Sequence, residues 1–291
     1  MALVRRKITL QFAYGTGPSG DGPPQSVTLS GHRVSVNVAN AGGAGMPTAH
    51  VRIFGLTLSM MNQLSTMGQL PNAYRANTIS VYAGDDVIGM AKIFEGTIQE
   101  AWADMQAAPE VAFNITAFAG LIDALRRSPP LSYPGTADAA VVLSNIADRM
   151  DDVAFENNGV SVILSTPYYP GTLREQALAV VQHAGIEWNG IENGVLAIWP
   201  RGGSRGGLVP RIAKDTGMVG YPTYTSTGLI VTTTFNPVVR HGGQIDVESS
   251  LTPACGRWVV AMLTHDIEAE VPSGKWLTLM QVAKPGYAPV V

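Results

Sequence analysis

The sequence is short of charged residues. Only 14% of its 291 residues are Asp, Glu, Lys or Arg, against about 25% in an average soluble protein. Nineteen basic and 22 acidic residues leave a formal net charge of −3, so the chain lacks the positive field of a protein that coats DNA non-specifically. Because 46% of the residues are hydrophobic, we expect a packed core rather than disorder.

Cysteine and long apolar runs are also scarce. The one cysteine, Cys255, excludes an intrachain disulfide and fits a reducing compartment; we expect it to be a small packing residue. No stretch approaches 18 consecutive apolar residues, so we expect no transmembrane helix and no membrane insertion. The basic cluster at residues 5–7 is not followed by an apolar run, so we expect no secretory signal.

Turn-forming residues, in contrast, are abundant. The chain has 32 glycines and 19 prolines, together well above the usual share of about 12%, which favours a mainly β fold. Gly96 lies inside an expected long strand and predicts a bulge there. Alternating apolar and polar residues predict strands at residues 8–14, 26–30, 33–40, 50–56, 78–83, 91–102, 111–117, 229–235, 244–248, 257–267 and 275–282.

The middle of the chain has a different pattern. Helical spacing predicts helices over residues 136–150 and 172–183, the second opened by a capping box of Thr172 and Glu175 and closed by Gly185. A strand at 159–164 and a hairpin over 186–199 make this part α+β. Shorter helical turns are expected after residue 57, with Thr57 or Ser59 as the N-cap, and at 121–126.

Pro- and Gly-rich segments at 128–135 and 200–207 predict the domain boundaries. We therefore expect a β-barrel domain with a short helix at 1–127, an acidic α+β domain at 128–200 and a second β-barrel domain at 201–291. Their net charges are +1, −6 and +2, so the negative excess lies in the middle. The first and last domains also share an order of strands, which two related β-barrels bracketing a mixed α/β unit would produce.

Several residue groups are candidates for chemical sites. His265 and Asp266 suggest a Ser-His-Asp hydrolase, but no GxSxG motif accompanies them. Asp85 and Asp86 follow Gly84 between two strands, which favours a hairpin turn over a metal or acid–base site. The histidines have no metal-ligand spacing; they are His32, His50, His183, His241 and His265.

Two glycine-rich segments and one methionine cluster complete the candidates. Residues 41–47 (AGGAGMP) lack the Lys-Ser/Thr of a P-loop. Residues 201–207 (RGGSRGG) have the composition of an RNA-binding RGG segment, but a single short copy favours a linker. Met60, Met61 and Met67 favour helix core over a docking face. We assign no catalytic residue, no cofactor-binding residue, no metal ligand and no cofactor.

The last third of the sequence resembles the C-terminal barrel of phage baseplate hub proteins, the tail-tube-like hubs of contractile-tailed phages and related injection machines. The resemblance lies in the order and spacing of short motifs. They are GMVGYP at 217–222, GLIV at 228–231, FNP at 235–237, GQIDVES at 243–249, GRWVV at 256–260, THD at 264–266 and KW at 275–276.

The first third is similar to the same family. HVRIFGL at 50–56 is followed by a Met/Leu helix, and ISVYAG at 79–84 by KIFEGTI at 92–98. Asp85 stands where the family usually has tyrosine. Residues 128–200 fit the family in kind rather than by motif.

The resemblance implies a structural role without chemistry. Two tube-like barrels in each of three chains would form a homotrimeric, pseudo-sixfold ring that joins the tail tube, or a distal tube protein, to the central spike. It implies a virion protein of the tail baseplate, assembled in the bacterial cytoplasm, with DNA passing non-specifically through the channel. Tape measure and wedge proteins are further candidate partners. The acidic middle would face solvent or line the channel mouth.

Two alternatives of other classes stay open at this point. One is a β-rich hydrolase that uses His265 and Asp266. The other is a glycan-binding module of the tail tip that uses exposed Trp and Tyr side chains. We favour the hub, and therefore expect that the protein is not an enzyme.

Overall fold

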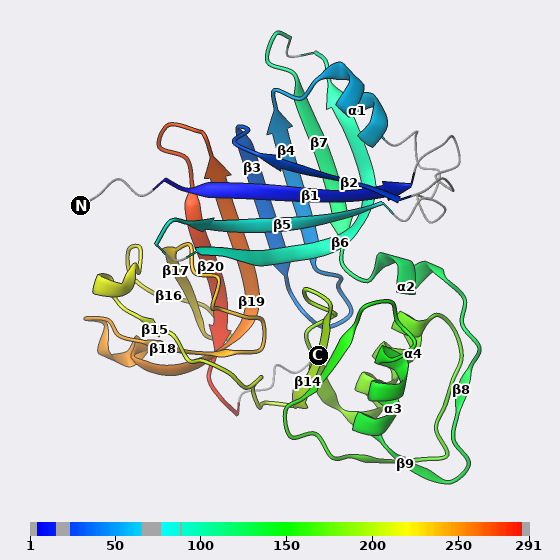
Figure 1. Ribbon diagram of the computed structural model, residues 1–291. Helices are drawn as coiled ribbons and strands as arrows, with labels where there is room; N and C mark the ends of the chain where they lie inside the picture. Colours follow the sequence, from blue (N-terminus) through cyan, green and yellow to red (C-terminus); the bar gives the residue numbers. More distant parts are fainter. Residues whose placement is uncertain (1–4, 16–23, 66–76, 88, 107, 287–291) are drawn as a thin grey trace. The chain divides into compact units, whose positions relative to one another are not determined.

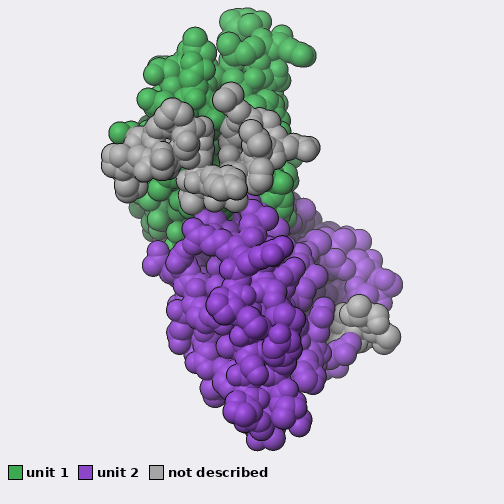
Figure 2. All heavy atoms as spheres, turned by 90° about the vertical axis from the view of Figure 1, so that its right-hand side faces the viewer, with its two compact units in different colours: residues 1–39, 48–119, 265–277 green, residues 40–47, 120–264, 278–291 purple. Residues whose placement is uncertain are grey.

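The computed structural model describes residues 5–15, 24–65, 77–87, 89–106 and 108–286. The chain divides into two compact units, coloured separately in Figure 2. Unit 1 consists of residues 1–39, 48–119 and 265–277, and unit 2 of residues 40–47, 120–264 and 278–291. Each unit is therefore assembled from segments that are far apart in the sequence.

Unit 1 is an antiparallel sheet with one short helix, α1 (Leu58–Leu64). Its neighbouring strands follow the order β3-β4-β7-β6-β5-β1-β2. The strands are β1 (Lys7–Gly15), β2 (Pro24–Ser30), β3 (Val34–Asn40), β4 (Thr48–Phe54), β5 (Thr78–Asp85), β6 (Gly89–Asp104) and β7 (Ala112–Phe118). The end of β19 (Gly256–Ala269) pairs next to β3.

The long strand β6 turns the sheet of unit 1 onto itself. In Figure 1, β1, β2 and β5 cross β3, β4 and β7 at a steep angle, and β6 curves from the first set to the second. Its first half pairs with β5 and its second half with β7. Register shifts leave Ile93 and Gln99 as extra residues, and such bulges bend a strand at the corner between crossed layers.

Gly96 is not the bulge that the sequence predicts. It pairs regularly with Ile79. A Cβ at Gly96 would lie 2.7 Å from both the Phe118 carbonyl oxygen and the Phe94 ring. Close approach of neighbouring groups, rather than an inserted residue, therefore requires glycine here.

Alternation along the strands places the core of unit 1 between the crossed layers. Val34, Val36 and Val38 of β3 are buried while the residues between them are half-buried. Full burial of a valine contributes roughly 1.5–3 kcal/mol, so several such strands supply a substantial core. The helix α1 adds Met61 and Leu64 to it and begins at Thr57, whose hydroxyl accepts the Met60 N–H at 3.3 Å.

Unit 2 contains the α+β part of the chain, whose core lies between its helices and short sheets. Helices α3 and α4 contact each other, and β10, β14 and β13 form a three-stranded sheet. The elements are α2 (Leu121–Leu125), β8 (Leu131–Ser132), β9 (Thr136–Asp138), α3 (Ala139–Ala147), β10 (Ala154–Asn157), β11 (Ile163–Ser165), β12 (Tyr168–Tyr169), α4 (Leu173–Ala184), β13 (Ile186–Trp188) and β14 (Val195–Pro200).

Helix α4 matches the sequence prediction closely. The Thr172 hydroxyl accepts the Glu175 N–H, the Glu175 carboxylate accepts the Thr172 N–H, and Gly185 ends the helix in the left-handed conformation. Helix α3 is shorter than predicted, because residues 136–138 pair as β9 and Asp138 caps the helix by accepting the Ala140 N–H at 2.8 Å.

The other strands of unit 2 belong to the same large, mainly antiparallel sheet of 13 strands, in the order β16-β17-β20-β19, with β18 on β19 and β15 parallel to β18. The core of this part includes Leu229, Ile245, Trp258 and Met280. The strands are β15 (Arg211–Ile212), β16 (Thr223–Tyr224), β17 (Leu229–Thr234), β18 (Gln244–Val247), β19 and β20 (Trp276–Ala283), with short 3₁₀ turns at Lys214–Thr216 and Thr252–Ala254.

The expected mainly β fold with a few helices is confirmed. No closed barrel is present in the part of the chain that the structure describes, because the pairing order ends at β2 in unit 1 and at β16 in unit 2. Closure requires the first and last strands of a sheet to pair. The large sheet therefore keeps two open edges, one at β2 and one at β16.

Candidate functional site

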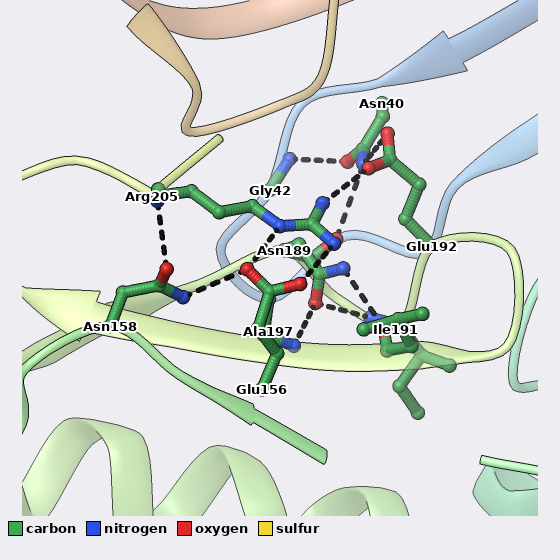
Figure 3. Close-up of polar contacts among 11 residues, drawn as sticks. Asn40, Gly42, Glu156, Asn158, Asn189, Ile191, Glu192, Ala197 and Arg205 are labelled. Carbon is green, nitrogen blue, oxygen red and sulfur yellow. Dashed lines mark hydrogen bonds and ion pairs between the residues drawn. The ribbon is translucent and has the colours of Figure 1, made fainter. Parts of the chain in front are cut away.

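The most elaborate polar site in unit 2 is centred on Arg205, as Figure 3 shows. Its side chain is 3% exposed. The guanidinium donates two hydrogen bonds to Glu156, at 3.0 and 2.9 Å, and one to Glu192 at 2.9 Å. Glu156 lies on β10 and Glu192 in the turn before β14, so the arginine joins two elements of the α+β part to the segment that follows β14. We call these three side chains the Arg205 network.

The Arg205 network extends to the loop that follows β3. The Asn40 amide donates to the Glu192 carboxylate and to the Asn189 carbonyl, both at 3.2 Å. The Asn40 side-chain oxygen accepts the Gly42 N–H at 2.9 Å. Figure 3 shows these contacts from separate segments converging around the guanidinium, which fixes the start of the 40–47 loop.

Asparagine side chains form hydrogen bonds with the backbone groups around the Arg205 network. The fully buried Asn189 donates to the Val195 carbonyl and accepts the Ala197 N–H, both at 2.9 Å. Asn158 donates to Glu156 at 3.0 Å and accepts the Gly206 N–H at 2.7 Å. Buried polar groups are costly unless they are hydrogen-bonded, and these contacts remove that cost.

The two carboxylates of the Arg205 network are electrostatically distinct. Hydrogen bonding from Arg205 lowers the pKa of the partly exposed Glu156 below its ordinary value. Burial raises the pKa of Glu192, although the Arg205 guanidinium and the Asn40 amide oppose that rise. The carboxylates raise the pKa of Arg205 despite its burial. The network therefore keeps a buried cation paired.

A second buried arginine, Arg174 on α4, holds the rest of the 40–47 loop. Its guanidinium donates to the carbonyls of Gly190 at 3.0 Å, Gly45 at 2.7 Å and Ala44 at 3.2 Å. It also lies 5.2 Å from the ring of Trp188. Three carbonyl acceptors and a ring face satisfy this cation within unit 2.

His241 packs between the 40–47 loop and β14. Its ring lies 5.7 Å from that of Trp199, and its Nε2 contacts the Ala261 carbonyl at 3.1 Å. Among the residues that the structure describes, buried Nδ1 has no hydrogen-bond partner, and burial lowers the pKa of His241 to about 4. A Cβ at Gly42 would lie 2.3 Å from its Cε1, so the histidine fits against a residue without a side chain.

The structure separates the residues of the hydrolase alternative. His265 and Asp266 are neighbours on β19, where the first is buried and the second half-buried. Alternation sends them to opposite faces. Asp266 instead accepts a hydrogen bond from Lys275 at 2.9 Å, and burial lowers the pKa of His265 to about 4.

The other titratable candidates have local roles. Asp85 accepts the Val87 N–H at 2.7 Å in the turn between β5 and β6, which confirms the predicted hairpin. His50 contacts Thr116, and His183 contacts Tyr169. Across the described ranges, no three His, Cys, Asp or Glu side chains gather in a way that could hold a metal ion.

The linker interpretation of residues 201–207 is wrong for its second arginine. Arg205 is buried in an ionic network rather than exposed as a linker or RNA-binding residue. The sequence contains no signal of this, because its partners Glu192 and Glu156 lie 13 and 49 positions away and the local pattern is only RGGSRGG. Residues 41–47 form a loop, as predicted, but one anchored by Asn40 and Arg174.

Cys255 is not the packing residue that we expected. It is exposed, and its Sγ accepts the Ser249 N–H at 3.3 Å and donates to the Ser249 carbonyl at 3.1 Å. The methionine prediction holds for Met61, which is 7% exposed in α1; Met67 lies outside the described residues.

The tryptophans offer little surface for stacking on a glycan. Trp188, Trp199, Trp258 and Trp276 are all buried, whereas Trp102 is 43% exposed. Within the described ranges, no helix is both long enough and apolar enough to cross a membrane.

Comparison with known proteins identifies the class. The family profile described as Baseplate hub gp41 matches residues 8–271. The chain belongs to this family. It is a structural component of the phage tail baseplate, and the family is a structural one rather than a family of enzymes. This confirms the resemblance found in the sequence. No curated protein matches the chain.

Solved structures share the fold at very low sequence identity. A tail protein from Neisseria meningitidis MC58 aligns over 95% of this chain and 97% of its own, with a TM-score of 0.61 and 8% identity. The E. coli c3393 protein, a type VI secretion component similar in structure to T4 tail proteins gp27 and gp5, aligns over 89% and 76%, with a TM-score of 0.58 and 10% identity. A chain of a Francisella PdpA–VgrG complex aligns over 99% and 60%, with a TM-score of 0.56 and 9% identity.

Proposed function

We propose that three copies of the chain form a homotrimeric, pseudo-sixfold ring that joins the tail tube to the central spike and encloses the DNA channel. Membership of the baseplate hub family supports this role. The observation that carries the ring is the large sheet of each chain, which has one part in each unit and open edges at β2 and β16 among the described residues. Two such parts in each of three chains give six parts around the ring. Pairing between copies would complete the barrels at 1–127 and 201–291.

The edge strand β16 has the surface that an interface needs. Tyr224 is 54% exposed, Tyr221 just before the strand is 68% exposed, and Ile230 on the adjoining strand β17 is 42% exposed. Soluble proteins protect open edges with charges or cover them, and interfaces are enriched in tyrosine and depleted of charge. An edge with exposed apolar residues is therefore suited to burial against a second copy.

The partners follow from this position in the tail. They would be the tube or distal tube protein and the spike, with the tape measure and wedge proteins as further contacts; the Francisella neighbour comes from a complex that contains VgrG. The ring would be built in the bacterial cytoplasm before it joins the virion. The net charge of −6 in residues 128–200 would repel DNA from this part, whether it faces solvent or lines the channel mouth.

Mass photometry of the purified chain with its tube and spike proteins tests the ring. We expect a species of about 92 kDa, three times the 30.7 kDa chain, and complexes built on it. Tyr224→Lys should weaken the trimer by about tenfold or more, because it charges the edge. The equally exposed Val141→Lys on α3 is the control. A chain that stays monomeric at every concentration with both proteins present would contradict the ring.

A further inference from the structure

Unit 2 contains a cavity of about 800 Å³. Leu178 and Val181 of α4 line one part, Trp188 and Trp199 of the small sheet another, and His241 and Met262 a third. Sites for small organic ligands usually enclose about 300–1,000 Å³. The cavity is therefore large enough for several side chains or a short peptide.

The two tryptophans present mainly apolar surface to the cavity, because their indole N–H groups are already bonded within the protein. The indole N–H of Trp188 donates to the Gly43 carbonyl, and that of Trp199 to Glu187, both at 2.8 Å. Leu178, Val181 and Met262 add aliphatic surface to these rings, and the uncharged polar side chains at the cavity are Gln182, Thr227 and Gln281. The buried His241 adds no charge, since its pKa of about 4 keeps the ring neutral at physiological pH.

The charged residues at the cavity favour an anion. Glu187, Arg201 and Lys284 line it, and Lys284 is the cation on which the proposal rests. The Glu187 carboxylate is engaged by the Trp199 indole and lies 3.5 Å from the Gly202 nitrogen. Arg201 and Lys284 are exposed, and Lys284 Nζ lies 5.6 Å from the Trp258 ring. A ligand with an apolar body and a negative group would match both the walls and the charges.

We propose that this cavity is a docking site for a short apolar peptide segment that carries a carboxylate and belongs to a partner protein of the baseplate. Ala41, Gly43 and Ala44 on one side and Gly202 and Gly203 on another present almost no side chain to the cavity. A main chain can approach such residues closely. The proposal concerns a contact of the single chain, so it stands apart from the homotrimeric ring.

Calorimetric titration of the full chain tests the docking site. The probe is the peptide acetyl-Gly-Leu-Phe-Glu with a free C-terminus, compared with its Gln, C-terminally amidated twin and with octanoate. We expect one saturable site for the acidic peptide and at least about threefold weaker binding of the uncharged twin.

Variants connect that binding to the cavity. Leu178→Trp should abolish binding of the peptide by filling the cavity. Gln182→Trp should also abolish it, and it does not alter buried packing because Gln182 is an exposed α4 position that lines the cavity. Lys284→Glu should weaken binding about threefold or more, and Lys214→Glu, an exposed lysine outside the cavity, should leave it unchanged.

Three outcomes would overturn the docking site. They are no binding of the acidic peptide, equal binding by Gln182→Trp and the unaltered chain, or binding of octanoate without binding of the peptide. The last would assign the cavity to a small amphiphile instead.

Discussion

At the scale of single residues, the Arg205 network is the feature with the largest predicted energetic effect. Arg205→Met removes the only guanidinium that the structure places between Glu156 and Glu192. It leaves the buried Glu192 without its cation, which typically costs about 3–5 kcal/mol in the free energy of unfolding. Urea denaturation measures this change.

Two further variants keep that prediction testable. Arg126→Met breaks an ion pair with Asp151 whose side chains are 62% and 81% exposed, and should change the stability by less than about 1 kcal/mol. Combining Arg205→Met with Glu192→Gln should recover part of the loss. Equal effects of the two arginine substitutions would show that burial of the pair is irrelevant.

Gly42 and Gly43 form a matched pair for a steric prediction. Both have left-handed φ angles, +62° and +61°, so alanine meets the same backbone strain at either position. A Cβ at Gly42 would lie 2.3 Å from His241, whereas none of the described atoms lies within 4 Å of one at Gly43. Gly42→Ala should therefore lower the melting temperature clearly more than Gly43→Ala. Equal melting temperatures would contradict the contact.

The two buried histidines predict a loss of stability in acid. His241 and His265 have pKa values of about 4 in the fold against 6.5 in the unfolded chain, so unfolding takes up protons between these values. Stability is full above about pH 6.5 and falls as the pH drops toward 4, by about 3 kcal/mol for each histidine. Denaturant titrations at pH 7 and pH 5 measure the difference.

Asp123 has the opposite effect on stability as the pH falls. Burial raises its pKa to about 6 from 3.8, so the folded state holds this proton more tightly and gains stability as the pH falls through that window. Asp123→Asn should therefore make the acid-induced loss steeper. A loss of stability from pH 7 to pH 5 that is equally steep in both proteins would contradict the raised pKa of Asp123.

Whether a side-chain contact could be predicted depends on how close its two partners lie in the sequence. The capping box of Thr172 and Glu175 spans three positions, and its outcome could be predicted because both partners lie in one helical turn. The Arg205 network could not, because Asn40 and Glu192 are separated by 152 positions. Only tertiary folding brings them together, and no periodic pattern encodes it.

At the scale of elements, helix α4 gives the clearest test. Thr172→Ala removes the oxygen that accepts the Glu175 N–H and should cost about 1 kcal/mol. Thr172→Ser keeps that oxygen and should cost less. Thermal unfolding of the two variants distinguishes the cap from the packing of the buried threonine. A serine variant as unstable as the alanine variant would assign the effect to packing.

Strand prediction succeeds where alternation is long. β3, β7 and β20 lie within a residue or two of their expected ends, because one buried face imposes a period of two over seven or eight residues. Two-residue strands such as β8, β12 and β16 have no room for such a pattern and depend on their partners. The bulge predicted at Gly96 is wrong, because a glycine inside a strand can also mark a close approach of neighbouring groups. The extra residues of β6 are Ile93 and Gln99.

At the scale of the whole molecule, the scarcity of charge has a structural explanation. Many of the charged side chains that the chain does have are used within it: Arg5 with Glu270, Arg211 with Asp215 and Glu248, and the buried arginines. The apolar edge at β16 carries few charges, as a surface destined for contact would. The family could be predicted from spaced motifs, but the open sheet edges could not, because a repeated strand order does not say which strands pair.

The exposed thiol of Cys255 has a practical consequence. It is the one sulfhydryl in the sequence, so a maleimide reagent attaches a single heavy-atom cluster or dye to each chain without any substitution. Counting those labels on an intact tail by electron microscopy, or by stepwise photobleaching, reads the copy number directly. Three marks around the axis would place the chain within the particle, and six would require a different stoichiometry.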